Sequence, residues 1–260
     1  MQQELAGGEE KRPHEAVRYW PRRIGHANLF VSDWEKSIDF YINVIGLEET
    51  YRRTAFDAGF LSNGSTHHDV AVIQMRPPSG PLLNSSGRVG LNHLAFELEN
   101  EVELVVGYHR ILEWGSFQRG RDHDNTHSVY SHDPDGNGTE VYCDVIKNWR
   151  AIKSGVLTRD NTSWEPPERP DVESYYDMDF EQRRVGHAVF HPIRCTHGVL
   201  VISEDNYAAA YTYYKDVMGL LPVLGGRESW FTAYQGALGE RTLSIFRASG
   251  GVAPCFHHFG

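Results

Sequence analysis

Cysteine is scarce in this sequence of 260 residues. The three cysteines, Cys143, Cys195 and Cys255, lie far apart, and no pair has the short spacing of a zinc knuckle or redox motif. They cannot form a closed disulfide framework, so we expect a reducing compartment, the cytoplasm. Long apolar runs are also missing. No stretch approaches the roughly 20 residues of a membrane span, and the polar N-terminal residues lack the apolar core of a signal peptide.

Positive charge is in deficit as well. The sequence has 25 Lys and Arg against 35 Asp and Glu, a net charge of −10, which argues against a protein that binds a phosphate backbone. We therefore expect no nucleic-acid partner. Histidine, in contrast, is abundant: there are 14, concentrated in a few short stretches. Because histidine is the commonest metal ligand and the usual acid/base near neutral pH, these positions are the first candidates for a functional site.

A β-α-β-β-β pattern occurs three times along the chain. The first unit begins at Ile24, with a helix expected over residues 33–46 and strands up to Met75. A second unit opens with VGLNHLAFELE, has a helix expected over residues 101–115, and ends at Asp144. The third repeats the layout of the first, with CTHGVLVI as its opening strand. Such repetition predicts an α+β fold of tandem βαβββ modules, paired into a cupped mixed sheet around a site.

The repeats divide the chain into four regions. We expect a flexible N-terminal extension over residues 1–23, a catalytic pair of modules over 24–146, and a charged, proline-rich linker or surface excursion over 147–194. Residues 195–260 form a third module and the opening strand of a fourth, CFHHFG. This last region lacks a counterpart of Glu140, so we expect it to be non-catalytic. We also expect the sequence to be part of a four-unit protein about a quarter longer.

Two histidines and one glutamate form a candidate metal site. His26 and His93 stand on the opening strands of the first two units, and Glu140 stands on the strand that closes the second. Each alone could be an ordinary strand residue. If the two units are related by pseudo-symmetry, however, the histidines occupy equivalent positions and face one cleft. Two imidazoles and a carboxylate make a facial triad that suits Fe(II) or Mn(II) and leaves positions open for a substrate and O2.

Four separated motifs resemble type I extradiol ring-cleaving dioxygenases of the vicinal oxygen chelate superfamily. LNHLAFELE and SVYSHDPDGNGTEVYCD resemble the catalytic half of these enzymes, in which the pattern YxxDPxGNxxE ends on the third metal ligand, here Glu140. FLSNGSTHHDVAV resembles the double-histidine segment of the family. The resemblance covers about residues 24–144. It implies that His26, His93 and Glu140 hold Fe(II), with Mn(II) as the alternative.

The resemblance also implies catalytic roles. His68 matches the acid/base, with His67 as the alternative, and Tyr130 matches a tyrosine that hydrogen-bonds the substrate oxygen. His123, with His127 close by, matches a histidine that steadies an oxyanion. The implied reaction is extradiol cleavage of a catechol-type diol with both atoms of O2. It gives a hydroxymuconic semialdehyde-type product in the catabolism of aromatic compounds, and the family resemblance implies a homo-oligomer.

The three ligands alone leave other chemistries open. Thiol transferases and glyoxalase-like isomerases of the same superfamily use strand His, His and Glu ligands, the isomerases with an added Glu or Gln. A metal-free small-molecule binding protein can also have this fold, although an intact ligand set disfavours it. The tyrosine ten residues before Glu140, together with the double-histidine segment, favours the dioxygenase.

Overall fold

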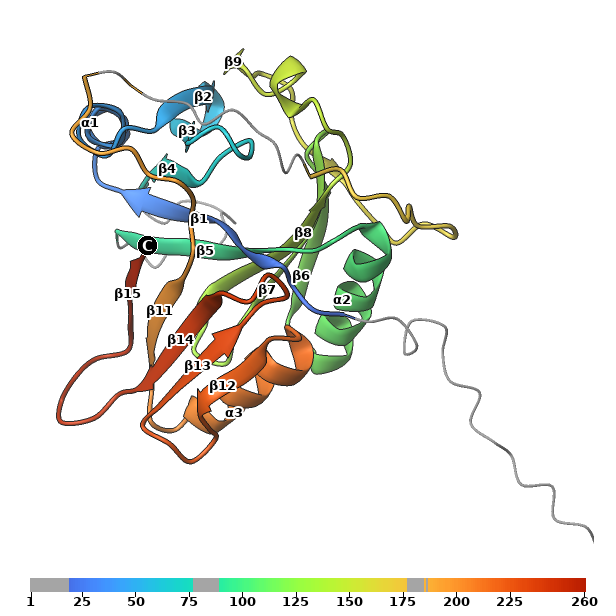
Figure 1. Cartoon of the computed structure of the whole chain (residues 1–260), viewed down its shortest axis with the longest axis vertical. Helices are drawn as coiled ribbons and strands as arrows, with labels where there is room; N and C mark the ends of the chain where they lie inside the picture. The colour runs from blue at the N-terminus through green and yellow to red at the C-terminus, as the bar shows by residue number, and fades with distance from the viewer. Residues whose placement is uncertain (1–18, 77–88, 177–184, 186) are drawn as a thin grey trace, which may run out of the picture.

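A computed structural model describes residues 19–76, 89–176, 185 and 187–260 (Figure 1). Most of the expected N-terminal extension lies outside these residues. The first module contains β1 (Arg23–Val31), α1 (Trp34–Phe40) continued by a π-helical turn (Tyr41–Ile45), β2 (Glu48–Arg53), a 3-10 turn (Thr54–Phe56), β3 (Ala58–Ser62) and β4 (Val70–Gln74). The second contains β5 (Gly90–Glu97), α2 (Glu101–Trp114), β6 (Phe117–Asp122), β7 (Thr126–His132) and β8 (Gly138–Asp144).

Local signals in the sequence fix the two longer helical segments. The side chain of Asp33 accepts a hydrogen bond from the backbone N–H of Lys36 at 3.1 Å, and so caps the start of α1. Asn100 caps α2 in the same way, at 3.2 Å from the N–H of Glu103. The first helical segment ends before Gly46 and α2 ends before Gly115, and both glycines adopt positive φ.

The eight strands of the first two modules, with the later strands β9 (Gly155–Val156) and β10 (Thr162–Ser163) at the edges, form one mixed sheet of ten strands. Its order is β10-β6-β7-β8-β5-β1-β4-β3-β2-β9. Within each module the opening and closing strands are parallel, β1 with β4 and β5 with β8. The modules meet where β1 pairs with β5 in antiparallel orientation. The two opening strands therefore lie side by side at the centre of the sheet. This arrangement confirms the predicted α+β fold of tandem modules.

The segment after β8 joins the two edges of this sheet. It contains a 3-10 turn (Trp149–Ala151), β9 (Gly155–Val156) and β10 (Thr162–Ser163). β9 pairs with β2 and β10 pairs with β6, which are the outermost strands of the first and second modules. Residues 155–163 thus run from one end of the strand order to the other, over the first two modules (Figure 1).

The third module, together with β15, forms a separate five-stranded sheet. It contains β11 (Gly198–Ile202), α3 (Tyr207–Thr212) with a π-helical turn (Tyr213–Val217), β12 (Leu221–Gly225), β13 (Phe231–Gln235) and β14 (Arg241–Arg247). β15 (Cys255–Phe259) pairs antiparallel with β11, as β5 does with β1. The hydroxyl of Tyr213 contacts Ser131 Oγ at 2.8 Å and Thr139 Oγ1 at 2.7 Å, so the helical side of this module packs on the second module.

Two further expectations concerned disulfide bonds and membrane-spanning segments. The three cysteines are all free thiols. Within the described residues, no helix is both long enough and apolar enough to cross a membrane.

Candidate metal centre and active site

The candidate ligands stand on three adjacent strands and face the same side of the sheet. β1 pairs with β5 so that His26 is opposite Ala95, and β5 pairs with β8 so that Ala95 is opposite Glu140. His93 precedes Ala95 by two positions and therefore projects from the same face. β7 extends the row, because Tyr130 pairs with Glu140. The strand register thus brings together residues that are more than a hundred positions apart in the sequence.

The ligand atoms of these three residues converge. One carboxylate oxygen of Glu140, Oε2, lies 3.1 Å from His26 Nε2 and 2.8 Å from His93 Nε2. The contact with His93 lacks hydrogen-bond geometry, which leaves its Nε2 as a buried nitrogen without a hydrogen-bond partner. Ligands about 2.1 Å from one ion and at right angles to one another lie about 3 Å apart. The donor set and its spacing therefore fit a divalent ion that prefers nitrogen and oxygen ligands.

Protonation in the buried site also favours metal binding. Burial would raise the pKa of Glu140, but the close contacts with His26 and His93 hold it well below its usual value, so this group is a carboxylate. Burial lowers the pKa of His93, an effect that Glu140 partly opposes, so its imidazole is neutral near pH 7. A carboxylate and neutral imidazoles are the forms that coordinate a metal.

Ala95 was not predicted, although it lies at the centre of the ligand row. It is fully buried between His26 and Glu140, and its methyl group is small enough for the two side chains to meet across it. A single alanine in an apolar strand carries no chemical signal in the sequence. Only the register of β5 between β1 and β8 reveals its place.

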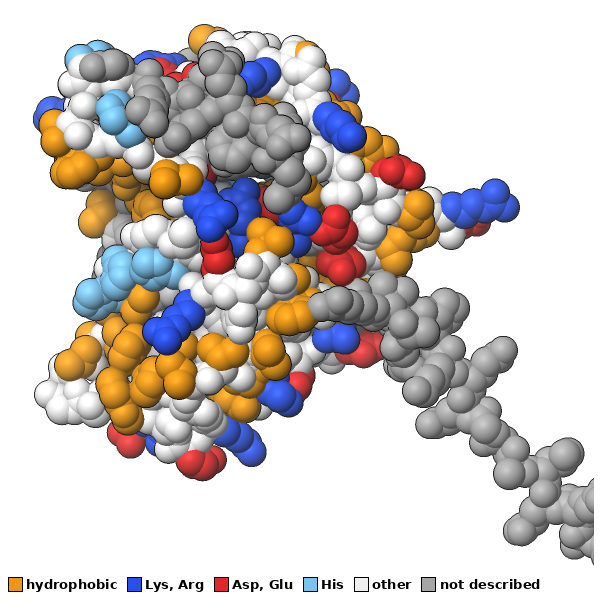
Figure 2. Space-filling view, viewed as in Figure 1, with side chains coloured by type: hydrophobic (Ala, Val, Ile, Leu, Met, Phe, Trp, Pro, Cys, Tyr) orange, Lys and Arg blue, Asp and Glu red, His pale blue; other side chains and the backbone are white. Residues whose placement is uncertain are grey.

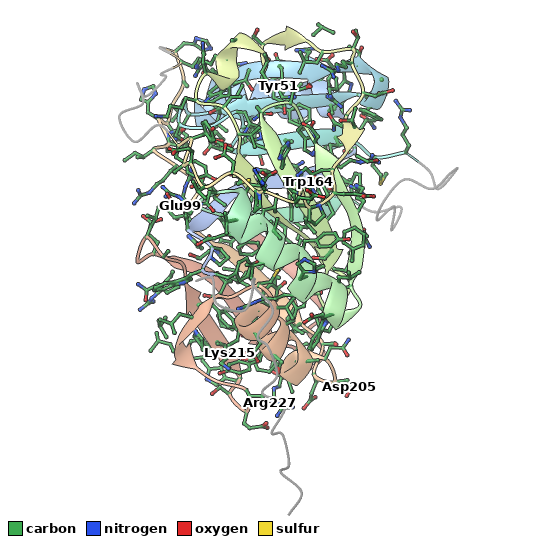
Figure 3. The ribbon with its side chains drawn as sticks, turned by 90° about the vertical axis from the view of Figure 1, so that its right-hand side faces the viewer. Tyr51, Glu99, Trp164, Asp205, Lys215 and Arg227 are labelled. Carbon is green, nitrogen blue, oxygen red and sulfur yellow. The ribbon has the colours of Figure 1, made fainter. Side chains whose placement is uncertain are left out.

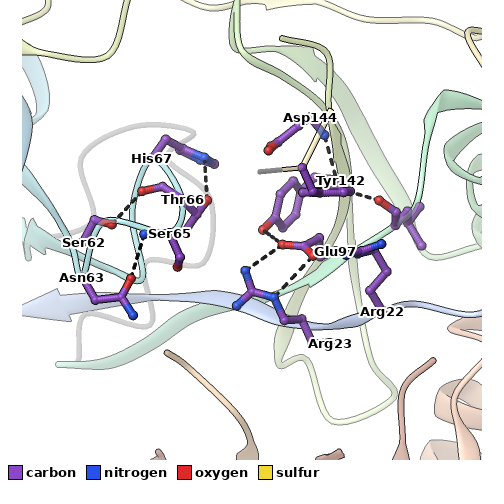
Figure 4. A network of polar contacts seen from close by, with 12 residues as sticks. Arg22, Arg23, Ser62, Asn63, Ser65, Thr66, His67, Glu97, Tyr142 and Asp144 are labelled. Atoms are coloured by element: carbon purple, nitrogen blue, oxygen red, sulfur yellow. Dashed lines mark hydrogen bonds and ion pairs between the residues drawn. The ribbon is translucent and has the colours of Figure 1, made fainter. Parts of the chain in front are cut away.

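A buried ion-pair network holds the same strands together (Figure 4). Glu97 accepts hydrogen bonds from Arg22 Nε at 3.0 Å, from Arg23 Nη2 at 2.9 Å and from the Tyr142 hydroxyl at 3.4 Å. These contacts connect β5 to β1 and β8, the strands that carry the three ligands. The network therefore fixes the spacing on which the site depends.

The double-histidine segment reaches the ligand row from the first module. The ring of His68 lies 4.0 Å from that of His26, centre to centre, and its Nε2 is 3.1 Å from the Oδ1 of Asn28, another residue that was not predicted. His67 lies farther from His26, at 5.7 Å, and its Nδ1 contacts Thr66 Oγ1 at 3.2 Å (Figure 4). Burial, with the neighbouring imidazoles, lowers the pKa of both His67 and His68 well below the usual value.

The second module supplies the other two candidate catalytic groups. The hydroxyl of Tyr130 lies 3.0 Å from His123 Nε2, and the guanidinium of Arg119 stacks 4.3 Å from the centre of the Tyr130 ring. Burial raises the pKa of Tyr130 well above its usual value, and Glu140 adds to this effect, so the hydroxyl keeps its proton. Burial also lowers the pKa of His123 to about 4, so this imidazole is neutral.

His127, the alternative to His123, has a different environment. Its Nδ1 lies 2.7 Å from Glu101 Oε1, a residue of α2, and the same carboxylate accepts a hydrogen bond from Trp164 Nε1 at 3.1 Å. The side chains of His127 and His123 therefore have separate partners, and of the two it is His123 that contacts Tyr130.

Comparisons with known proteins bear on the family and the fold. Residues 23–141 match the family described as the Glyoxalase/Bleomycin resistance protein/Dioxygenase superfamily. The match covers the first two modules, and it confirms the resemblance seen in the motifs. Two curated relatives are named as dioxygenases of aromatic diols.

One relative is catechol-2,3-dioxygenase of Bacillus subtilis (strain 168), 28% identical over 197 residues, which are 75% of this chain and 64% of the relative. Another is biphenyl-2,3-diol 1,2-dioxygenase 3 of Rhodococcus globerulus, 32% identical over 124 residues, which are 47% of this chain and 63% of the relative. The matched segments thus span less than two thirds of the length of either relative.

Solved structures share the fold at lower identity. The 2,3-dioxygenase LapB from Pseudomonas sp. KL28 superposes with a TM-score of 0.60 at 16% identity, covering 90% of this chain and 73% of that chain. The Mn(II)-bound glyoxalase from Novosphingobium aromaticivorans superposes with a TM-score of 0.59, also at 16% identity, covering 92% and 65%.

Proposed function

We propose that this protein is a metal-dependent extradiol dioxygenase. It would open a catechol-type ring beside its two hydroxyl groups, add both atoms of O2, and release a hydroxymuconic semialdehyde-type product in the catabolism of aromatic compounds. The observation that carries the proposal is the convergence of His26, His93 and Glu140 on one buried face, with Tyr130 and the double-histidine segment beside them. Fe(II), or alternatively Mn(II), held by these ligands would supply the centre at which the diol and O2 meet.

His68 is the group best placed to take a proton from the substrate. Its Nε2 faces the Oδ1 of Asn28, an acceptor, so the neutral ring carries its proton on Nε2. Its Nδ1 is buried and has no hydrogen-bond partner among the described residues. That nitrogen therefore keeps a free lone pair, which suits it to accept a hydroxyl proton and return it later.

Tyr130 and His123 are suited to bind oxygen atoms of the substrate. Both are neutral, Tyr130 is buried and His123 is half-buried, and their contact at 3.0 Å fixes the orientation of the phenol and the imidazole. Donors that are already oriented in a water-poor site stabilise developing negative charge without rearrangement. We assign Tyr130 to the substrate oxygen and His123 to an oxyanion derived from the ring.

Oxygen uptake tests the proposal. Protein loaded with Fe(II) or Mn(II) without air, then mixed with catechol and air-saturated buffer, should consume O2 and turn yellow as the ring opens. His93→Ala should abolish both the bound metal and the reaction. If the protein instead converted the hemithioacetal of methylglyoxal and took up no O2 with catechols, it would be a glyoxalase-like isomerase. Against this alternative, the ligand cluster around Glu140 has no second carboxylate among the described residues. If the metal-loaded protein showed neither of these activities, the proposal would be contradicted.

A further inference from the structure

Lys153 is a buried cation that has no counter-ion among the residues that the structure describes. The residue is 3% exposed, and its side chain forms no ion pair or hydrogen bond with any described residue. Its Nζ lies 5.6 Å from the centre of the Tyr51 ring. An ammonium group withdrawn from water without a carboxylate partner is energetically costly. Burial accordingly lowers the pKa of Lys153 to about 8, and the charge of Arg53 adds to this effect.

Arg53 is a second buried cation in the same place. It is 8% exposed, and its Nη2 donates to the carbonyl of Arg159 at 2.8 Å and to Asn161 Oδ1 at 2.6 Å. Both acceptors are neutral, and within the described ranges Arg53 forms no ion pair. The carboxylates whose charge reaches Lys153 belong to Asp122 and Asp124, and Asp124 is already paired with Arg159 at 3.1 Å.

The strand register places both cations beside the candidate active site. β9 pairs with β2 so that Gly155 is opposite Tyr51, which brings Lys153, two residues earlier, to the Tyr51 ring. Arg53 follows Tyr51 by two positions and projects from the same face of β2. In Figure 3 the segment after β8 passes over the strands of the first module near Tyr51.

Tyr51 and Asn161 connect the cations to the catalytic histidines. The Tyr51 ring packs edge-on against His68, 6.3 Å between centres. Asn161, which accepts a hydrogen bond from Arg53, also lies beside His123 and affects its pKa. The charges of Lys153 and Arg53 contribute, after burial, to the low pKa of His123. The two cations therefore lie beside the candidate catalytic histidines, within reach of the space that these residues border.

We propose, on the basis of the proposed function, that Lys153 and Arg53 form an anion-binding subsite for a carboxylate on the catechol ring. A carboxylate there would supply the counter-ion that the described residues lack, and would bind both cations through charge-assisted hydrogen bonds. The preferred substrates are then catechols with a short carboxylated side chain, and neutral alkylcatechols are poorer substrates.

A matched pair of substrates tests this subsite. We expect kcat/KM for 3,4-dihydroxyphenylacetate to exceed that for 4-ethylcatechol, which has a neutral side chain of similar size. Lys153→Met should lower this ratio about 10- to 100-fold, the usual effect of removing a hydrogen bond between charged groups. Lys153→Arg should restore most of the ratio. Lys147→Met, which removes an exposed charge from the same segment, should leave it unchanged.

Binding without turnover separates this proposal from the proposed function. Phenylacetate should raise the melting temperature of the metal-free wild-type protein but not that of Lys153→Met. Neutral phenylacetamide should not raise the melting temperature of either protein. If no catechol is cleaved but the phenylacetate shift is present and depends on Lys153, the dioxygenase proposal fails and the subsite stands. If catechols are cleaved but Lys153→Met leaves the substrate ratio and the phenylacetate shift unchanged, the subsite is overturned.

Discussion

At the scale of single residues, the two neighbouring histidines of the first module differ in what they contact. His68 lies against His26 and Asn28, whereas His67 contacts Thr66. We predict that His68→Phe keeps the bound metal but lowers kcat about 10²- to 10⁴-fold, the usual contribution of a general acid/base. His67→Phe, the matched control, should lower kcat much less. Metal content and O2 uptake, measured on the same samples, check both. Loss of metal from His68→Phe, or a larger loss of activity in His67→Phe, would assign the roles differently.

Residue type and the internal repeat were enough to propose the candidate ligands, because histidine and glutamate carry a chemical signal in the sequence, whereas the catalytic groups were implied by the family resemblance. Asn28, Ala95 and Lys153 do not stand out in this way. Asn28 and Lys153 are polar residues of common types, and Ala95 is one alanine in an apolar strand. Their roles follow from which strand lies beside which, and a single sequence does not contain that register.

At the scale of strands, the site depends on the small residue at the centre of β5. We predict that Ala95→Val fills the space between His26 and Glu140 and weakens metal binding at least about tenfold, with an overpacking cost of about 1–3 kcal/mol in stability. Ala27→Val is the matched control. Ala27 follows His26 on β1 but packs in the main core, on the other face. The Ala27→Val variant should lose about as much stability as Ala95→Val and yet bind metal with the affinity of the wild-type protein. Metal titration and thermal unfolding separate the two effects, and equal metal affinity in both variants would argue against this role of Ala95.

The elements themselves were predictable to different degrees. The helices expected over residues 33–46 and 101–115 match the structure because their caps and terminal glycines are local signals. β9 and β10 have two residues each, too few for any periodic pattern. The sequence of residues 147–194 is charged and rich in proline, and yet Trp149 and Trp164 in this segment are buried. Trp164 contacts Glu101 and Tyr108, which are far away in the chain.

At the scale of the molecule, the third module repeats the strand arrangement of the first, but the described residues do not give it a complete set of metal ligands. β15 pairs with β11 so that His258 is opposite Val199, the register that His93 and Asn28 have in the first pair. Histidine side chains gather on the surface near the C-terminus, where His257 and His258 are exposed (Figure 2). The described residues give this cluster no partner like Glu140. That the third module is non-catalytic, and that the protein forms homo-oligomers, stay predictions.

The central claim is that the buried cluster of His26, His93 and Glu140 directs both atoms of O2 into a catechol beside its hydroxyl groups. Single turnover of the Fe(II)-loaded protein with catechol and isotopically labelled O2 tests it most directly. The product should be reduced at once with borohydride, before its aldehyde exchanges oxygen with water, and analysed by mass spectrometry. We predict a ring-opened product with two labelled oxygen atoms, cleaved outside the diol. One labelled atom, none, or cleavage between the two hydroxyl carbons would contradict this account.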